Sequence, residues 1–250
     1  MRSFSENKDG VKKRENRSFA VVIPVYNHGT TLAGIVERAR RLAIPVIVVD
    51  DGSTDGGTAG LEALQGVEVL RHAMNRGKGA ALRTGFERAA EVADWAITMD
   101  ADGQHHPEDA PGLMAAIPDG RRPIIVGARQ GMQAGEVPWT SRFGRGFSNF
   151  WIRASGGPAI SDTQSGFRIY PLPESLAFRI ASGRYQFELE ILVKAHWSKM
   201  PIIEVPVMVT YPKGRLRVSH FRPFVDFMRN THTFTRLITR RLLNKAAIFL

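Results

Sequence analysis

Phe19–Asn27, with the sequence FAVVIPVYN, decides the fold together with a second stretch of the same kind, Pro45–Asp51, PVIVVDD. Each is a short apolar run, rich in β-branched residues, that ends in polar side chains. Runs of this length and composition predict strands buried on both faces. Between them, apolar residues recur at helical spacing: Leu32, Ile35, Val36, Ala39 and Leu42. Strand, helix and strand in this order predict a β-α-β unit, and therefore a parallel sheet.

The same alternation continues along the chain. Further strands are predicted at Val67–Leu70, Trp95–Met99, Ile124–Val126 and Ile202–Val209, and helices at Gly79–Val92, Arg142–Ala154, Phe187–Ala195 and from Phe221 onward. Pro107 stands where a helix readily begins, and Asp162–Arg168 reads as a loop or the start of a strand. The predicted fold class is α/β, with a mostly parallel central sheet and helices on both of its faces.

Polar side chains follow four of the predicted strands at the point where each strand ends. The clusters are Tyr26-Asn27, Asp50-Asp51, Asp100-Ala101-Asp102 and Gly127-Ala128-Arg129. In parallel sheets the carboxyl ends of the strands share one edge, and ligands bind there. We therefore expect all four clusters to collect at one site.

The segment Asp100–Pro107, DADGQHHP, places two carboxylates one residue apart, directly after a buried strand. Both can reach one hard cation, which would keep open positions for a diphosphate. The cation would then neutralise charge on a departing nucleoside diphosphate. The alternative is an ordinary Asp/Gly turn, with His105 and His106 either as additional ligands or as plain loop residues.

Two more segments have both a functional and a structural interpretation. The acidic side chains of Asp50–Asp55, DDGSTD, can accept hydrogen bonds from a nucleotide base or ribose. The alternative is that Ser53, Thr54 or Asp55 only caps the helix that follows. Asn75–Ala80, NRGKGA, precedes a helix whose N-terminus favours an anion. The spacing of a Walker phosphate loop is absent from this segment.

Composition limits the class of protein and its setting. The chain has 250 residues, no cysteine and a formal net charge of +10. Disulfides and thiolate metal sites are therefore excluded. The first 18 residues are polar and charged, which predicts a disordered arm and no secretory signal. No run of about 18 apolar residues occurs. We expect a cytoplasmic protein that is peripheral on the cytoplasmic face of the membrane.

The C-terminal tail carries most of the excess charge. From Tyr211 to Leu250 there are nine basic residues and one acidic residue. Phe221, Phe224, Val225 and Met228 stand at helical spacing beside arginines, which suits a helix lying on anionic lipid. The alternative is a helix that packs on its own domain. The expected organisation is an arm over residues 1–18, a catalytic domain over 19–220 and a basic amphipathic helical tail over 221–250.

Six motifs, in this order, resemble the family 2 glycosyltransferases, and within them the polyprenyl-phosphate (dolichol-phosphate) hexosyltransferase group. They are VVIPVYN (Val21–Asn27), VVDDGSTD (Val48–Asp55), NRGKGAALRTGF (Asn75–Phe86), MDADGQHHPED (Met99–Asp109), VGAR (Val126–Arg129) and DTQSGFRIY (Asp162–Tyr170). The resemblance extends from about Phe19 to Phe221. It implies a GT-A fold, a UDP- or GDP-sugar donor, Mg²⁺ or Mn²⁺, and inversion at the transferred sugar.

The resemblance also assigns roles to residues. Asp100 and Asp102 would hold the metal, with Gln104 nearby, and Asp50 and Asp51 would bind the nucleotide. Asp102, Arg129 and Asp162 are the candidate catalytic residues. The donor-binding set implied by the resemblance is Pro24, Tyr26, Asn27, Asp50, Asp51, Lys78, Asp100, Ala101, Asp102, Gln104, Arg129, Arg142, Arg168 and Arg215.

The acceptor stays open at this stage. A polyprenyl phosphate is already an anionic nucleophile and needs no strong base, whereas a hydroxyl acceptor would need one, for which Asp162 is the candidate. The tail departs from the family pattern because many relatives carry transmembrane helices there. A sugar nucleotidyltransferase is disfavoured, because no Gly-rich basic loop follows the first strand. A basic nucleic-acid-binding protein is the alternative of another class, but no nucleic-acid motif is present, so no nucleic-acid partner is expected.

Overall fold

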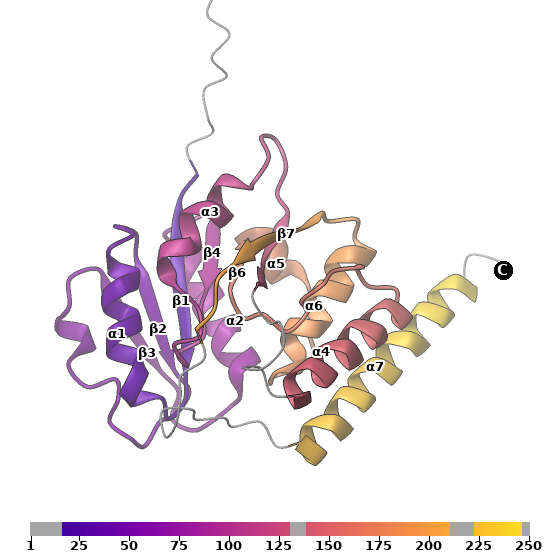
Figure 1. The fold of residues 1–250 in the computed structure, drawn as a ribbon, viewed down its shortest axis with the longest axis horizontal. Coiled ribbons are helices and arrows are strands. Elements are labelled where there is room, and N and C mark those ends of the chain that lie inside the picture. Colours follow the sequence, from indigo (N-terminus) through magenta and orange to yellow (C-terminus); the bar gives the residue numbers. More distant parts are fainter. Residues whose placement is uncertain (1–16, 131–138, 211–222, 247–250) are drawn as a thin grey trace, which may run out of the picture.

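The structure, a computed structural model, describes residues 17–130, 139–210 and 223–246. Within this part of the chain a seven-stranded sheet has the order β3-β2-β1-β4-β6-β5-β7 (Figure 1). The first four strands along the chain are parallel. They are β1 (Phe19–Val25), β2 (Val46–Asp50), β3 (Val67–Arg71) and β4 (Trp95–Thr98). The pairing of Val25 with Asp50 brings the ends of β1 and β2 to the same level at one edge.

The other half of the sheet contains β6, which the sequence predicts as a loop or the start of a strand. β6 (Arg168–Pro171) lies between β4 and β5 (Ile124–Arg129) and is antiparallel to both. β7 (Ile202–Val207) then pairs parallel with β5. The prediction of a mostly parallel α/β sheet is confirmed, and the segment predicted as a loop or strand start becomes a strand from Arg168.

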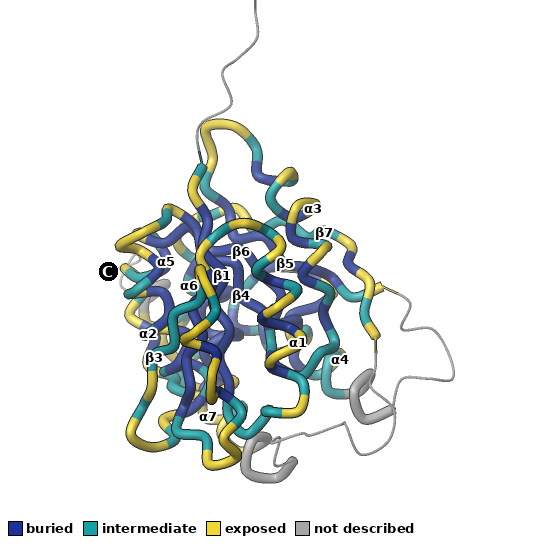
Figure 2. Tube along the Cα trace, turned by 90° about the vertical axis from the view of Figure 1, so that its left-hand side faces the viewer, coloured by how far each residue is buried: buried dark blue, intermediate teal, exposed yellow. Residues whose placement is uncertain are grey.

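Helices cover both faces of the sheet, as predicted. They are α1 (Gly29–Arg40), α2 (Lys78–Ala89), α3 (Ala110–Ala115), α4 (Trp139–Ala154), α5 (Leu172–Ala177), α6 (Gln186–Trp197) and α7 (Pro223–Ala246), with short 3₁₀ turns η1 (Leu61–Ala63) and η2 (Pro107–Asp109). Val22 of β1 packs in one core cluster with residues of α2 and α6. Its neighbours Val21 and Ile23 pack in a second cluster with residues of α1 and α3. Alternate residues of β1 thus supply two buried layers, and Figure 2 shows the strands of the sheet in the buried interior.

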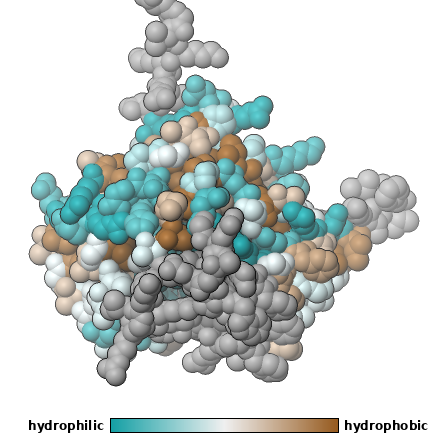
Figure 3. All heavy atoms as spheres, viewed as in Figure 1, coloured by the Kyte–Doolittle hydropathy of each residue, from teal (hydrophilic) through white to brown (hydrophobic). Residues whose placement is uncertain are grey.

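The C-terminal helix α7 packs on its own domain over part of its length. Phe234 and Leu237 are only 2% and 1% exposed, and the Phe234 ring stacks on Trp151 of α4 at 6.1 Å between ring centroids. Met228, Leu242 and Leu243 of the same helix are exposed, and Figure 3 shows hydrophobic surface beside the C-terminal end of α7. Phe221 and the side chains of Phe224 and Val225 lie outside the described residues. Domain packing therefore holds the middle of α7, and its ends keep apolar side chains exposed.

The part of the predicted arm that the structure describes is attached to the domain. Arg17 donates hydrogen bonds to the carbonyls of Ile117 and Pro118 and pairs with Asp119. Ser18 bonds the carboxylate of Asp94. Residues 1–16 lie outside the described part, so the arm stays a prediction, as do the proposed domain boundaries. Within the described ranges, no helix combines the length and the apolar character that a membrane span requires.

Candidate active site

The loop after β1 and the loop after β2 are joined by direct hydrogen bonds. Asn27 has a positive φ of 51°, which turns the chain sharply after β1. Its backbone N–H donates to Ser53 Oγ at 3.0 Å, and its side-chain oxygen accepts from the Thr54 N–H at 2.8 Å. Tyr26 is partly exposed beside this joint, whereas Pro24 is buried within β1. The predicted donor residues at these two strand ends therefore do lie together.

Asp50 and Asp51 at the end of β2 are both buried, and both bond to the protein itself. Asp50 accepts from the Ser53 N–H and from the Thr58 hydroxyl, each at 2.8 Å. Asp51 accepts from the backbone N–H groups of Arg76 and Gly77 at 2.9 and 2.7 Å. His72 Nδ1 lies 2.7 Å from Asp51 Oδ1. Asp51 thus fixes the loop that leads into α2. The alternative prediction, a helix cap at Ser53, Thr54 or Asp55, is wrong, because the next helical turn, η1, begins after Gly60 and has no side-chain cap.

Asp100, just after β4, is balanced by a half-buried cation. Lys78 Nζ lies 2.6 Å from Asp100 Oδ1 and 2.8 Å from Glu188 Oε2 of α6. Burial alone would raise the pKa of Asp100, but the Lys78 ammonium outweighs burial and keeps that pKa below its ordinary value. A Cβ on Gly166 would lie 2.3 Å from the Asp100 carboxylate. Asp100 therefore needs a glycine at position 166, on the segment leading into β6.

Asp102 is in a different electrostatic state. Its carboxylate accepts from the backbone N–H of Gln104 at 3.0 Å and from the Gln104 side-chain amide at 2.7 Å. Burial, followed by the negative charge of Asp100, raises the pKa of Asp102 to about 6. The carboxylate that the sequence predicts as a metal ligand therefore loses its proton at a higher pH than an ordinary aspartate does.

The two carboxylates are chemically suited to a divalent cation. Mg²⁺ is commonly bound through one or two carboxylates together with substrate phosphates and water, and the repulsion between Asp100 and Asp102 is the kind that a cation relieves. No cluster of three or more His, Asp or Glu side chains within the described ranges is arranged to hold a metal. Asp100 and Asp102 are therefore the described residues that could hold a divalent cation, together with oxygen ligands from another source such as a substrate phosphate.

The two histidines of the DADGQHHP segment point to different surroundings. His105 is buried against the Phe167 ring at 5.4 Å, and burial lowers its pKa to about 4. Its Nδ1 has no hydrogen-bond partner in the part of the chain that the structure describes. His106 instead approaches Arg38 and Thr210 through its two ring nitrogens. His106 is therefore part of a local network, and His105 is a neutral buried ring next to the acidic pair.

Arg129 at the end of β5 pairs with Asp162. The guanidinium donates from Nε to Asp162 Oδ2 at 2.6 Å and from Nη2 to Oδ1 at 2.9 Å. Burial alone would raise the pKa of Asp162, but Arg129 more than compensates and lowers it. Arg129 and Asp162, two of the predicted catalytic residues, thus form a salt bridge. A carboxylate with a lowered pKa and two guanidinium bonds is a weak general base.

Some predicted site residues do not reach the strand edge. Arg168 is 0% exposed, and its guanidinium bonds the carbonyls of Ser165, Thr163 and Glu188 and the Tyr170 hydroxyl. These contacts give it a structural role in the core, and a phosphate contact stays an untested prediction that this geometry disfavours. Ala101 is buried, and its carbonyl accepts from the Thr31 hydroxyl. The side chain of Arg142 and all of Arg215 lie outside the described residues.

Two residues that sequence reasoning missed belong to this site. Glu188 shares Lys78 with Asp100, and its buried Oε1 has no hydrogen-bond partner among the described residues. His72 holds Asp51. A usable signal for Glu188 is present in the sequence, because an acidic residue in the apolar run of α6, QFELEILV, is costly to bury unless it is paired.

A mostly parallel sheet, with acidic residues at the ends of β2 and β4 and an arginine at the end of β5, has the GT-A architecture of glycosyltransferases. The family model "Glycosyl transferase family 2" matches residues 20–172, more than half of the chain, and the protein belongs to that family. It is therefore a glycosyltransferase by family.

Individual relatives agree with this assignment. The chain is 29% identical to the UDP-N-acetylglucosamine–dolichyl-phosphate N-acetylglucosaminyltransferase of Methanococcus voltae, over 76% of this chain and 85% of the relative. It is 29% identical to the polyprenol monophosphomannose synthase of Mycolicibacterium smegmatis, over 87% of this chain and 86% of the relative. These two relatives support the resemblance to the polyprenyl-phosphate group.

A solved structure agrees on the fold. Glucosyl-3-phosphoglycerate synthase of Mycobacterium tuberculosis superposes with a TM-score of 0.67 at 21% identity, over 90% of this chain and 81% of that protein. That enzyme has been crystallised with Mn²⁺ and UDP-glucose.

Proposed function

We propose that this protein is an inverting, metal-dependent hexosyltransferase that moves a sugar from a UDP- or GDP-sugar to a polyprenyl phosphate at a membrane surface. The observation that carries the proposal is the group of charges at the strand edge. Asp100 and Asp102 follow β4, Lys78 neutralises the first of them, and Arg129 lies at the end of β5. Both named relatives act on lipid phosphates by their names, which supports the acceptor class.

Asp100 and Asp102 would hold Mg²⁺ or Mn²⁺, with Gln104 fixing the orientation of the second carboxylate. The bound cation would supply charge neutralisation for the nucleoside diphosphate that leaves. The fold similarity to an enzyme crystallised with Mn²⁺ and UDP-glucose is consistent with this assignment. Asp50, Asp51 and the Asn27 loop would form the wall that receives the nucleotide, since they stand at the neighbouring strand ends.

The state of Asp162 supports an acceptor that needs no base. Attack by a hydroxyl requires a group that takes its proton. Asp162 is salt-bridged to Arg129 and its pKa is lowered, so it is poorly suited to that task. A lipid phosphate is already an anion at neutral pH, so it attacks the anomeric carbon without losing a proton. Arg129, at the same strand edge, would help to attract that anion.

Peripheral contact with the membrane is the remaining part of the proposal. The ends of α7 expose Met228, Leu242 and Leu243, and the residues from 211 to 250 are strongly basic. An amphipathic basic helix of this kind binds anionic bilayers through its apolar and charged residues together. We place this contact on the cytoplasmic face, where nucleotide-sugars are available.

A donor-by-acceptor screen tests the proposal. Purified protein with Mn²⁺ or Mg²⁺ receives UDP- and GDP-sugars, with and without polyprenyl phosphate in detergent, and released nucleoside diphosphate is measured. Release that depends on polyprenyl phosphate is the expected result. Thermal stabilisation by one donor without such release would reject the lipid-phosphate acceptor and favour a hydroxyl acceptor such as a glycolipid. If the screen shows neither nucleoside diphosphate release nor thermal stabilisation, the catalytic assignment is contradicted.

A further inference from the structure

Glu188, in the first turn of α6, is a buried carboxylate that contacts Lys78. Its side chain is 8% exposed, and its Oε2 lies 2.8 Å from the Lys78 ammonium. The other oxygen, Oε1, is buried and has no hydrogen-bond partner among the described residues. Burying a carboxylate with one oxygen unsatisfied costs free energy, whereas an apolar side chain of similar volume would not. Packing alone therefore does not explain an acid at this position.

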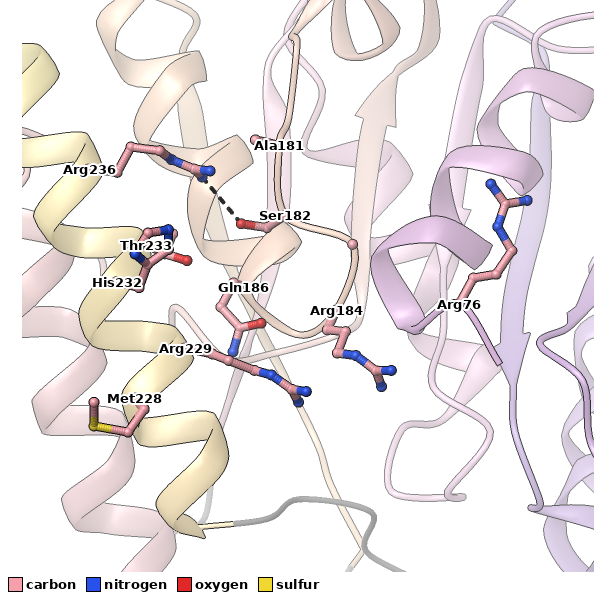
Figure 4. A pocket seen from close by; sticks show the side chains of 11 residues that line it. Arg76, Ala181, Ser182, Arg184, Gln186, Met228, Arg229, His232, Thr233 and Arg236 are labelled. Carbon is pink, nitrogen blue, oxygen red and sulfur yellow. Dashed lines mark hydrogen bonds between the residues drawn. The ribbon is translucent and has the colours of Figure 1, made fainter. Parts of the chain in front are cut away.

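The backbone of Lys78 is fixed against the start of α6 by two glycines. A Cβ on Gly79 would lie 2.5 Å from Phe187 Cβ, and a Cβ on Gly77 would lie 2.6 Å from a carbonyl of the segment that leads into α6. Figure 4 shows Arg184 on that segment, beside the start of α2. Any larger residue than glycine would push the two elements apart. The close approach therefore sets how the Lys78 side chain meets α6.

Lys78 divides one positive charge between two carboxylates. Its Nζ lies 2.6 Å from Asp100 Oδ1 and 2.8 Å from Glu188 Oε2. Burial alone would lower the pKa of the Lys78 ammonium, but the two carboxylates outweigh burial and raise that pKa above its ordinary value. One cation between two anions leaves a negative charge over. Without Glu188, Lys78 would neutralise Asp100 more fully, and Asp100 would attract a second cation less strongly.

We propose that Glu188 is a positioning residue for the metal site, which takes up part of the Lys78 charge so that Asp100 can also hold a divalent cation. The inference rests on the proposed function, because it concerns the same aspartates. An ammonium and a divalent cation that share one carboxylate repel each other. The unpartnered Oε1 of Glu188 is an unused acceptor for an ammonium proton when a cation competes for Asp100.

Glu190 shows what a structural acid on the same helix looks like. It lies two residues further along α6 and therefore faces another side of the helix. Its two oxygens accept from the backbone N–H groups of Ala181 and Ser182, each at 3.1 Å, and Lys194 pairs with it at 2.8 Å. Glu190 is satisfied by the protein, whereas Glu188 keeps one oxygen unused. Glu190 is thus a matched control for the loss of a buried carboxylate from α6.

The test measures binding of Mn²⁺ to the full-length protein at pH 7 without nucleotide, with free Mn²⁺ followed by electron paramagnetic resonance. Glu188→Gln should bind Mn²⁺ at least roughly tenfold more weakly than the native protein, because the full Lys78 charge then acts on Asp100. The double variant Lys78→Met/Glu188→Gln removes one charge of each sign and should return to within about threefold of the native affinity. Damage to packing would not be repaired by a second core substitution.

Glu190→Gln should bind Mn²⁺ within about twofold of the native protein, even where its melting temperature falls. If Glu188→Gln binds Mn²⁺ as tightly as the native protein, or if the double variant binds as weakly as Glu188→Gln, the inference is overturned and the proposed metal site stands. If the native protein shows no saturable binding up to about 10 mM Mn²⁺, or if Asp102→Asn leaves binding unchanged, the proposed metal site is contradicted and the inference falls with it.

Discussion

Two aspartate pairs follow buried parallel strands at the same edge of the sheet, and their surroundings differ. Asp50 and Asp51 after β2 accept hydrogen bonds from backbone N–H groups, a hydroxyl and an imidazole nitrogen. Asp100 and Asp102 after β4 face a lysine, a glutamine and each other. The first pair is satisfied by the protein and builds a rigid loop. The second pair retains repulsion, which a cation can remove. Two aspartate pairs at one edge of the sheet therefore differ in how fully the protein itself satisfies their carboxylates.

The largest effect is expected at Asp102. The Asp102→Asn variant should lose about 10²–10³-fold in sugar transfer, because a ligand charge for the cation disappears while the amide keeps a similar shape. The measurement is nucleoside diphosphate release under the conditions that activate the native protein. In EDTA at pH 7 the melting temperature of the variant should not fall below the native value, because the substitution removes a charge that is under repulsion. A variant with native transfer activity would show that the β4 pair does not bind the catalytic metal.

At Asp51 the expected effect is on stability. Asp51→Ala leaves the N–H groups of Arg76 and Gly77 and the His72 ring without their acceptor, which should lower the free energy of unfolding by about 3 kcal/mol. Urea denaturation measures this change. Asp119→Ala, whose side chain is 58% exposed, is the matched control and should cost less than about 0.5 kcal/mol. Equal losses in the two variants would remove the distinction between the aspartate pairs.

Unfolding free energies measured in EDTA at several pH values test whether the Asp102 carboxylate is under repulsion. The pKa of Asp102 is about 6 in the folded protein, above the value of about 3.9 for an unfolded aspartate. A raised folded pKa contributes stability at low pH that is lost as pH rises through about 6. Relative to the native protein, Asp102→Asn should therefore gain about 2 kcal/mol in unfolding free energy between pH 4.5 and pH 7. A pH-independent difference would show that the carboxylate is not under repulsion.

Asp50→Asn should have the smallest effect, below about 1 kcal/mol in unfolding free energy. The asparagine oxygen can still accept from the Ser53 N–H, and the Thr58 hydroxyl can turn to accept from the new amide. Chemical denaturation at pH 7 measures this change in the free energy of unfolding. A loss as large as that of Asp51→Ala would mean that the negative charge of Asp50 itself is required.

Strands that are short apolar runs could be predicted from sequence, because burial on both faces leaves a continuous hydrophobic signal. β1, β2 and β4 were found in this way, and with them the placement of Asp50, Asp51, Asp100 and Asp102. β6 could not be resolved so clearly. It has four residues, it begins with Arg168, and its partners β4 and β5 come from distant parts of the chain.

Arginine roles were the hardest to predict, since the side chain is seldom fully buried. Arg129 and Arg168 look equivalent in sequence, each following or opening an apolar strand. The fold places the first against Asp162 and surrounds the second with three backbone carbonyls. Only the pairing of residues far apart in sequence decides between these outcomes, and no local pattern records it.

The position of β6 also has a consequence for synthesis on the ribosome. β4 and β5 emerge well before β6, yet in the finished sheet both of them pair with β6. At ordinary translation rates β4 waits on the order of ten seconds with one edge unpaired. During that interval the nascent chain offers an open strand edge to any neighbouring strand, which is a hazard for aggregation. Correct production of this protein therefore depends on a strand of four residues arriving before the open edge finds another partner.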